Sequence, residues 1–393
     1  MLVNVASLYV LLLLLKNSHC NKDPDVHDPI ETIINRYGYQ MQNITVQTDD
    51  GYILQTFRIS PNGTNIEKIS GQPLVIWHAC DRNARSLVAN GKESLPFYYV
   101  DSGYDVWLPN IRGTKYSSHV SLTQKDAKYW NFSYGKIGRS DVKAVSEMIV
   151  QKTGKKLITM GHSLTTSALF VYASELPEEA SKNIKGIIGL APAINVYYSW
   201  AFKLPSLLPN TIRDTFGVFG MHYIDTGFAS ICELKIAQPL CEFLVDFSFG
   251  KGDNIDVGAS YARFFSKENN EPISSQVLIN YLQMMHSKGT FAEYDFGMLR
   301  NLKEYGKLTP PEFNIKNINV RTDLVCGTDD KVVSCKDSNN TYKMLQSEKS
   351  LTMLPNNDKC KGSVAHYDYY MNTDMKNCIF DPVDEILKNY KSL

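Results

Sequence analysis

Short apolar runs recur along the chain, and more polar stretches separate them. The runs lie at positions 74–77, 105–108, 157–160, 187–190, 323–326 and 351–354. Each spans about four residues and lacks regular polar alternation, which is typical of strands buried on both faces of a parallel sheet. The pattern therefore predicts a sheet of mainly parallel strands.

Several of the stretches between these runs have helical spacing. After Ser140 and Asp141, apolar residues recur every three or four positions, at Val142, Val145, Met148 and Ile149. Because serine and aspartate are common N-cap residues, we expect a helix to begin at this point. Further helices are expected at 164–176 and 382–390. Strands that alternate with helices predict a doubly wound α/β fold with helices on both faces of the sheet.

Residues 197–306 follow a different pattern. They are rich in phenylalanine, leucine, methionine and tyrosine, in short amphipathic pieces without strand-like alternation. We interpret this stretch as a mainly helical insertion that lies over the sheet. The chain then divides into a first core part at 21–196, a helical cap at 197–306 and a second core part at 307–393.

The N-terminus carries an apolar run, LYVLLLLL at 8–15, that is too short to span a bilayer. Ser18 and Cys20 are small residues before a cleavage point near Asn21, so 1–20 is typical of a secretory signal peptide, although no lysine or arginine precedes the run. A buried N-terminal helix is the alternative. No later run reaches 18 apolar residues, so no transmembrane segment is expected.

Composition and short motifs fit a secreted globular protein. The 41 Lys+Arg balance the 41 Asp+Glu, which argues against nucleic acid or an anionic membrane as a bulk electrostatic partner. Removal of the signal peptide takes Cys20 and leaves an odd number of cysteines, so at least one free thiol is expected. Four N-glycosylation sequons also fit secretion, and they lie at Asn43, Asn62, Asn131 and Asn339.

The run at 157–160 leads directly into Gly161-His162-Ser163, and helix-like residues follow. A serine at a sharp strand-to-helix turn lies beside backbone N–H groups of the helix N-terminus, which stabilise developing negative charge. Ser163 is therefore the candidate nucleophile, with a structural serine as the alternative. Thr165 stands where the G-x-S-x-G elbow has its second glycine.

A serine nucleophile needs a base and a group that orients the base. In α/β-hydrolases the acid and then the histidine follow the serine along the chain. Asp329 and Asp330 follow the strand at 323–326, at the sheet edge where such folds bind ligands, and one of them is expected to be a turn or capping residue. His366 precedes the last helix, whereas His286 lies inside the insertion, a poorer position for a base. An exposed loop histidine is the alternative for His366.

A second oxyanion donor is expected from the loop after an early strand. Trp77-His78-Ala79-Cys80 is the candidate loop, and Ala79 stands where a glycine is expected. The chain contains no G-x-x-x-x-G-K-[ST], H-E-x-x-H, C-x-x-C or G-x-G-x-x-G motif. We therefore expect neither a metal nor a cofactor.

Several stretches, taken in order, resemble motifs of the acid lipases, the family of lysosomal acid lipase, gastric lipase and their insect relatives. They are INRYGY at 34–39, TDDGYIL at 48–54, DVWLPNIRGT at 105–114, WNFSY at 130–134, LAPA at 190–193, YDFG at 294–297 and PPEFN at 310–314. The resemblance covers nearly the whole chain after the signal peptide. It implies an α/β-hydrolase fold in which a cap covers a fatty-acyl pocket.

By position in the family's motifs, the resemblance implies Ser163 as the nucleophile, His366 as the base and Asp330, rather than Asp329, as the acid. The expected function is a secreted or lysosomal serine ester hydrolase that cleaves neutral lipid esters such as triacylglycerols or sterol esters. The expected partners are the lipid ester and, transiently, a lipid interface.

The backbone N–H groups of Cys80 and Leu164 match the family's oxyanion donors. Two positions depart from the family, because Thr165 and Ala79 replace glycines that allow close backbone approach. The branched Cβ of threonine is expected to press on the preceding strand. The alternative function is therefore a catalytically weak or inactive lipase-like protein that binds lipid or a partner.

The resemblance also implies a disulfide between Cys232 and Cys241 in the cap. The pairing of the other cysteines stays open, with three candidates at Cys335, Cys360 and Cys378. Cys80 is the expected free thiol.

Overall fold

The computed structural model describes residues 23–200, 203–225, 232–233 and 237–390, and the predicted signal peptide at 1–20 lies outside them. In this part of the chain a central sheet of nine strands has the order β1-β2-β4-β3-β6-β7-β10-β11, with β5 paired to β2. The strands are β1 (Tyr39–Gln47), β2 (Tyr52–Pro61), β3 (Pro73–Ile76), β4 (Asp105–Pro109), β5 (Ser117–His119), β6 (Leu157–His162), β7 (Ile184–Leu190), β10 (Arg321–Gly327) and β11 (Lys349–Leu354).

The six apolar runs of the sequence are six strands of this sheet, and all of them pair in parallel, from β4 at one end to β11 at the other. Every residue of β3, β4 and β6 is buried, because helices cover both faces of the sheet. The predicted mainly parallel sheet is therefore confirmed.

Strands β1, β2 and β5 form an antiparallel end of the sheet that the apolar runs do not predict. Residues of β1 are alternately exposed and partly buried along much of the strand, so its sequence alternates and contains no continuous apolar run. The turn before β2 contains Asp50 and Gly51, and Gly51 has a φ of +93°. An aspartate–glycine pair between alternating segments is a hairpin signal.

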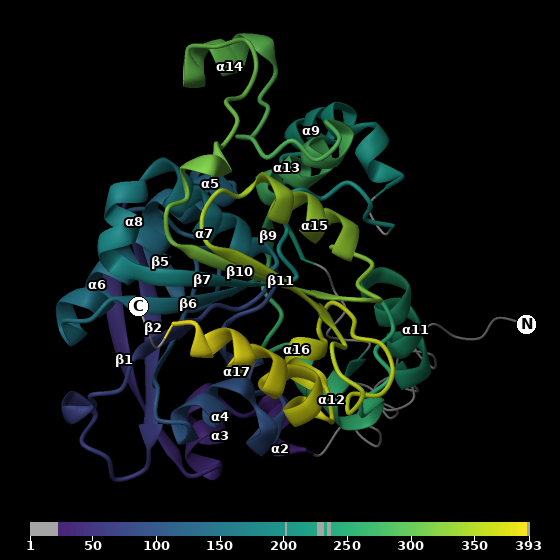
Figure 1. Cartoon of the computed structure of the whole chain (residues 1–393). Coiled ribbons are helices and arrows are strands. Elements are labelled where there is room, and N and C mark those ends of the chain that lie inside the picture. The colour runs from purple at the N-terminus through teal and green to yellow at the C-terminus, as the bar shows by residue number, and fades with distance from the viewer. Residues whose placement is uncertain (1–22, 201–202, 226–231, 234–236, 391–393) are drawn as a thin grey trace, which may run out of the picture.

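Helices cover the two faces of the sheet (Figure 1). One face carries α4 (Leu95–Asp101) and α17 (Asp381–Lys388), and the other carries α6 (Lys143–Thr153) and α7 (Leu164–Glu175). The helices expected at 164–176 and 382–390 are thus present. The other helices outside the insertion are α2 (Pro24–His27), α3 (Ile30–Arg36), α5 (Tyr134–Lys136), α8 (Pro177–Asn183), α15 (Cys335–Met344) and α16 (Asp368–Met371).

Short helical turns connect these elements. The 3₁₀ turns are η1 (Ile66–Lys68), η2 (Ala84–Val88), η3 (Gly91–Glu93), η4 (Ala127–Trp130), η6 (Pro205–Leu207) and η8 (Ile315–Asn317), and the π-helical turns are η5 (Ile137–Val142) and η9 (Lys376–Phe380).

The helix expected to begin at Ser140 begins earlier, so that prediction is wrong. Helices α5, η5 and α6 follow one another without a break from residue 134 to residue 153. The Asp141 carboxylate does not cap the helix, because it accepts the backbone N–H of Arg112 at 2.9 Å and its Nε at 2.8 Å. This partner comes from the loop after β4, and local spacing cannot reveal it.

Between β7 and β10 the described chain is mainly helical, with α14 projecting from the rest of the molecule (Figure 1). A two-stranded sheet of β8 (Tyr223–Ile224) and β9 (Ile273–Ser274) lies within the predicted mainly helical insertion. The helices are α9 (Pro209–Val218), α11 (Gln238–Phe249), α12 (Val257–Phe264), α13 (Ser275–His286) and α14 (Met298–Tyr305). Across the described ranges we find no helix with the length and hydrophobicity that a bilayer span requires.

Three disulfides link the described cysteines. Cys232 pairs with Cys241, Cys326 with Cys335, and Cys360 with Cys378. Among the cysteines that the structure describes, Cys80 has no disulfide partner. The Cys326–Cys335 bond closes the loop between β10 and α15, which contains Asp329 and Asp330.

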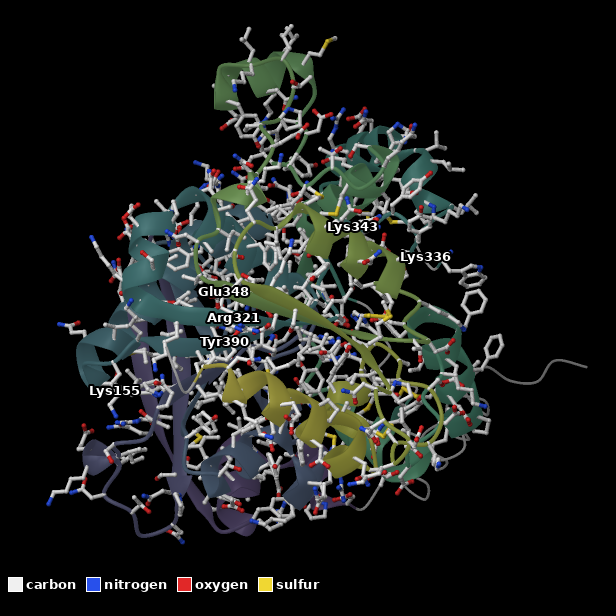
Figure 2. The ribbon with its side chains drawn as sticks, in the orientation of Figure 1. Lys155, Arg321, Lys336, Lys343, Glu348 and Tyr390 are labelled. Carbon is white, nitrogen blue, oxygen red and sulfur yellow. A yellow bond between two sulfur atoms is a disulfide. The ribbon has the colours of Figure 1, made fainter. Side chains whose placement is uncertain are left out.

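The amino-terminal end of β10 is fastened by charged and phenolic groups. Arg321 makes two hydrogen bonds to the buried Asp323 carboxylate, at 2.9 and 3.0 Å, and the Tyr390 hydroxyl donates to the same carboxylate at 2.7 Å. Figure 2 shows Arg321 and Tyr390 together at this edge. These contacts tie the chain after the last helix to the amino edge of the sheet. The candidate site lies at the opposite, carboxyl edge.

Candidate active site

Ser163 joins the end of β6 to the start of α7 in a sharp turn. Its backbone has φ +54° and ψ −113°, a sparsely populated conformation that a non-glycine residue keeps only where its surroundings hold it. The Ser163 N–H donates to the Leu190 carbonyl at 2.9 Å, and the Ser163 carbonyl accepts the Thr166 N–H at 3.1 Å. The turn has the strand–turn–helix geometry of a nucleophile elbow.

Two glycines let α7 lie close to the strands beneath it. A Cβ on Gly161 would lie 2.6 Å from Leu169 Cδ1 and 2.9 Å from the backbone nitrogen of Thr166. A Cβ on Gly189, in the neighbouring strand β7, would lie 2.8 Å from Thr166 Cγ2. The elbow thus keeps its tight packing through Gly161 and Gly189, and not through a glycine at position 165.

Asp330 and His366 form a buried hydrogen-bonded pair at the carboxyl edge of the sheet. His366 Nδ1 donates to Asp330 Oδ2 at 2.8 Å. The other carboxylate oxygen, Oδ1, accepts the backbone N–H groups of Val332 and Val333, each at 2.8 Å. Because Nδ1 carries the proton, the second ring nitrogen, Nε2, is available as a base.

The alternatives to this pair have other partners. The carboxylate of Asp329 accepts the backbone N–H of Lys251, at 2.7 Å, and so fastens the insertion to the loop after β10. His286 lies on α13, where its Nδ1 contacts the Ser206 carbonyl at 3.1 Å. The geometry therefore favours Asp330 over Asp329 and His366 over His286.

His162 connects the elbow to His366. Its Nε2 donates to the His366 carbonyl at 2.7 Å, and the two ring centroids lie 4.7 Å apart. Burial and the nearby charge of His366 hold the pKa of His162 well below its ordinary value. A neutral His162 avoids repulsion of an imidazolium at His366. Since His162 directly precedes Ser163, this contact brings the serine turn and the histidine together.

The loop after β3 carries the candidate oxyanion donor, Cys80. His78 fixes this loop, because its Nε2 accepts the Ile111 N–H at 3.3 Å and its Nδ1 donates to the Ala79 carbonyl at 2.8 Å. Burial lowers the pKa of His78 to about 4. The backbone at Ala79 does not have a positive φ, so its backbone conformation does not require a glycine.

Among the residues that the structure describes, the two candidate donor groups have no competing partner. Within the described residues, the Cys80 N–H makes no hydrogen bond, and the Leu164 N–H is the first of α7 and lacks a partner in its own helix. Asp81, next to Cys80, has a φ of +56°. Ser163 also has a positive φ. Each of the two segments that carry these donors therefore contains a non-glycine residue in an unusual backbone conformation.

A small cavity of about 20 Å³ lies beside Cys80 and Leu164. Residues of the core line one side, and residues of the insertion, among them Pro272 and Val277, line the other. This volume holds about one water molecule. An acyl chain can therefore bind here only if residues of the insertion move.

Glu271 fastens the insertion to the core at this cavity. Its carboxylate accepts Asn83 Nδ2 at 2.6 Å and the Lys115 N–H at 2.9 Å, and its own N–H donates to the Asp81 carbonyl at 2.9 Å. Burial raises the pKa of Glu271 to about 7. Nothing in the local sequence distinguishes this glutamate from an exposed one, so the motifs do not reveal it.

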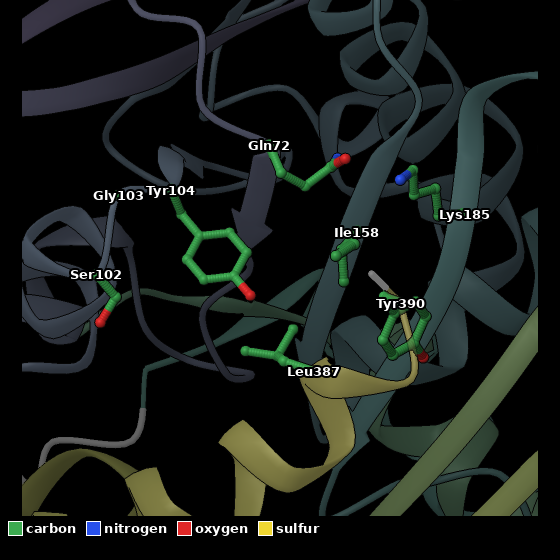
Figure 3. A pocket seen from close by; sticks show the side chains of 8 residues that line it. All are labelled: Gln72, Ser102, Gly103, Tyr104, Ile158, Lys185, Leu387 and Tyr390. Carbon is green, nitrogen blue, oxygen red and sulfur yellow. The ribbon is translucent and has the colours of Figure 1, made fainter. Parts of the chain in front are cut away.

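A larger cavity of about 330 Å³ lies at the opposite edge of the sheet, near the amino ends of β3, β6 and β7 (Figure 3). Gln72, Tyr104, Lys185 and Tyr390 are among the residues that line it. No serine–histidine or aspartate–histidine pair is among its lining residues. The candidate chemistry therefore lies at the carboxyl edge, where open α/β sheets bind their ligands.

The predicted glycosylation sites lie in different settings. Asn43, Asn62 and Asn131 are exposed, and Asn339 is partly buried on α15. The side-chain oxygen of Asn131 also accepts Gln276 Nε2 at 2.6 Å. In the described ranges, no cluster of three or more histidine, cysteine, aspartate or glutamate side chains is arranged to hold a metal ion.

Comparisons with known proteins identify lipases as relatives of this chain. Residues 30–90 match the family model described as the partial alpha/beta-hydrolase lipase region. Human lipase member K is 30% identical over 382 residues, which cover 94% of this chain and 93% of that protein. Mouse gastric triacylglycerol lipase is 32% identical over 310 residues, 76% of this chain and 78% of that protein.

Among solved structures, a soluble variant of monoglyceride lipase from Saccharomyces cerevisiae aligns with a TM-score of 0.53 and 17% identity, over 89% of this chain and 93% of that one. At this identity the match supports the fold alone. The sequence matches support more than the fold, because one relative at 30% identity spans nearly the full length of both chains. The chain belongs to the acid lipase family and is a carboxylic ester hydrolase.

Proposed function

We propose that this protein hydrolyses neutral lipid esters, such as triacylglycerols or sterol esters, with Ser163 as the nucleophile. The observation that carries the proposal is the buried Asp330–His366 pair, held next to the serine elbow by the bond from His162 to the His366 carbonyl. Mouse gastric triacylglycerol lipase, which is 32% identical, supports the substrate class.

The proposed reaction uses these groups as a catalytic triad. His366 Nε2 takes the proton of the Ser163 hydroxyl as the oxygen attacks the ester carbonyl. Asp330 keeps the proton on Nδ1 and stabilises the imidazolium that forms. His366 then returns the proton to the leaving alcohol, and a water molecule, activated in the same way, hydrolyses the acyl-enzyme.

The negative charge of each tetrahedral intermediate falls on the former carbonyl oxygen. We assign the backbone N–H groups of Cys80 and Leu164 as its donors, because both line one cavity and neither donates to another described residue. Loss of one such donor in an enzyme of this type costs about 3 kcal/mol of transition-state stabilisation.

The residues at 197–306 act in this proposal as a cap that meets a lipid surface, while 21–196 and 307–393 form the core. Trp200 and Phe247 are half exposed and pack with ring centroids 4.6 Å apart, and Phe243 is also exposed. The Trp200 N–H donates to the carbonyl of Lys331, the residue after Asp330, at 3.1 Å. This aromatic cluster therefore lies close to the loop of the triad acid.

The projecting helix α14 adds to the apolar surface of the insertion. Its residues Met298, Leu299 and Leu302 are exposed and share one face at spacings of three and four residues. Exposed Lys303 and Lys307 follow them along the chain. An amphipathic helix of this kind suits contact with a lipid interface.

The proposed location is extracellular or lysosomal. Three disulfides fit passage through the oxidising secretory pathway. Three of the four sequons are exposed. The signal peptide at 1–20 is part of this proposal. Edman sequencing of the mature secreted protein should begin near Asn21.

Hydrolysis of a soluble ester and of a triacylglycerol emulsion tests the function. Purified wild-type protein should cleave both between acid and neutral pH, and Ser163→Ala should lower kcat by about 10⁴-fold or more. A wild-type protein that hydrolyses no ester would instead support the catalytically inactive lipid-binding alternative. Full activity of Ser163→Ala would refute the assigned nucleophile.

A further inference from the structure

Thr165, which stands in place of the elbow's second glycine, lies between the two segments that carry the candidate oxyanion donors. It is fully buried. Its Oγ1 accepts the His162 N–H at 2.9 Å, and lies 3.1 Å from the His78 carbonyl and 3.0 Å from the His162 carbonyl. The hydroxyl has one proton, so it can donate to one of these two carbonyls at a time.

The position of this hydroxyl follows from the end of the β3–β6 ladder. The paired residues run from Leu74 opposite Ile158 to Ile76 opposite Met160, and the Trp77 N–H still donates to the Met160 carbonyl at 2.9 Å. Beyond this point the chain after β3 turns away to carry Cys80. The next N–H of β6 that faces the β3 side is that of His162. Because β3 has ended, this N–H has no partner in a strand.

A buried backbone N–H without a partner destabilises the fold, and so does a buried carbonyl. The Thr165 hydroxyl meets both needs, since it accepts from His162 and can donate to His78. It therefore extends the ladder by one side-chain bridge. A glycine at position 165 has no group that could take this place.

We propose that Thr165 is a positioning residue that sets the separation of the two oxyanion donors. Cys80 lies two residues after His78, and Leu164 directly precedes Thr165, so the bridge ties the two donors across a gap that no nearby covalent bond spans. The proposal rests on the proposed ester hydrolysis. It also reverses the expectation that Thr165 weakens the site.

Three variants separate the hydroxyl from the methyl group. Thr165→Val keeps the shape and removes the bridge, and Thr165→Ser keeps the bridge and removes the methyl group. Thr322→Val is the matched control, because the Thr322 hydroxyl is also buried and donates to a backbone carbonyl, that of Val320 at 3.1 Å, but lies at the amino end of β10, away from the candidate site. Thr165→Ala replaces Thr165→Val in the comparison if the valine variant does not fold.

Each variant is assayed for kcat and KM on a soluble p-nitrophenyl ester and for inhibition by a trifluoromethyl ketone, whose adduct with serine carries an oxyanion. Thr165→Val should lower kcat about 10- to 100-fold and weaken the ketone by a similar factor, with KM nearly unchanged. Thr165→Ser and Thr322→Val should stay within about threefold of wild type. Thermal unfolding checks that each variant is folded.

Two results would overturn the proposal while leaving the proposed function intact. One is a folded Thr165→Val with wild-type kcat and ketone affinity. The other is a Thr165→Ser that loses as much as Thr165→Val, which would assign the effect to packing of the methyl group. A wild-type protein without esterase activity would overturn both proposals together.

Discussion

The elbow and the helical insertion use their apolar residues in opposite ways. From the start of β6 to Ser174 in α7 every residue is buried. In the insertion, Val218 is 82% exposed, Phe219 73% and Phe243 61%. In the proposed function, the buried segment holds the reacting groups at fixed distances, whereas the exposed residues meet a lipid interface.

The difference shows where this enzyme needs precision. A displacement of about 1 Å at a nucleophile or an oxyanion donor lowers a rate about 100-fold, and the elbow is accordingly fixed by short hydrogen bonds and by two glycines. The insertion has to let an ester reach a cavity of about 20 Å³. In the proposed function, residues of the insertion therefore move before an acyl chain binds.

After the loss of Ser163 itself, the largest effect is expected from removal of the acid's charge in the rigid region. Asp330→Asn keeps the shape of the side chain but changes which His366 nitrogen carries the proton. We expect kcat on a soluble ester to fall about 10³- to 10⁴-fold. Asp329→Asn is the matched control, since its carboxylate contacts the Lys251 N–H instead, and it should stay within about threefold of wild type. Equal losses in both variants would remove the assignment of Asp330.

A second prediction concerns Glu271, a residue of the insertion that forms hydrogen bonds with the core. Burial raises its pKa from an ordinary 4.5 to about 7, so the folded protein binds this proton before the unfolded chain does. Its contribution to stability is therefore full below about pH 4.5 and is lost as pH rises through about 7. Glu271→Gln should abolish a gain on the order of 3 kcal/mol in unfolding free energy on acidification over this window.

Glu268→Gln is the control for this measurement. A hydrogen bond from Lys115 lowers the pKa of Glu268, so its charge stabilises the fold above about pH 4.5 and the gain disappears only at lower pH. Urea unfolding at several pH values should therefore show the wild-type increase between pH 7 and pH 4.5 in Glu268→Gln. If Glu271→Gln also kept this increase, the increase would not come from protonation of the Glu271 carboxylate.

A pair of glycine substitutions compares packing in the two regions. Gly161→Ala places a methyl group 2.9 Å from the backbone nitrogen of Thr166 and should lower the unfolding free energy by about 1–3 kcal/mol and reduce kcat. Gly217 lies in α9, where an added Cβ meets no atom within 4 Å. Gly217→Ala should raise stability by about 0.5–1 kcal/mol without changing kcat. Equal effects measured by denaturant unfolding would contradict the comparison.

The smallest effect is expected at the surface of the insertion. Phe243→Ser should reduce hydrolysis of a lipid emulsion about 5- to 10-fold, because one aromatic contact with the interface is lost. Hydrolysis of a soluble short-chain ester should not change. Val120→Ser is the control, because Val120 is an exposed apolar residue outside the insertion. It should change the hydrolysis rate of neither substrate. A Phe243→Ser protein that loses both activities equally would argue against an interfacial role.

Much of the fold could be predicted from the sequence, because strands buried on both faces must be continuously apolar. The runs at 157–160 and 323–326 show this directly. The hairpin of β1 and β2 was missed because it faces solvent on one side, and only its aspartate–glycine turn signals it. The start of the helix near Ser140 was misplaced because Asp141 binds Arg112, a contact made only in the folded protein.

The candidate site divides in the same way. Ser163, Asp330 and His366 occur in recognisable motifs, and the structure brings Asp330 and His366 to 2.8 Å. Glu271 depends on contacts with Asn83 and Lys115, which are distant along the chain and meet it only after folding. Thr165 is the instructive case, because its motif indicates a lost glycine while its hydroxyl bridges two backbone segments.

The central claim is that the elbow carries an activated serine although Thr165 replaces a glycine. Intact-mass analysis after exposure to a fluorophosphonate tests it most directly, since this reagent labels only an activated nucleophile. We predict one adduct per chain, located at Ser163 by peptide mapping and absent from Ser163→Ala. An unlabelled wild-type protein, or an adduct that persists in Ser163→Ala, would contradict the account.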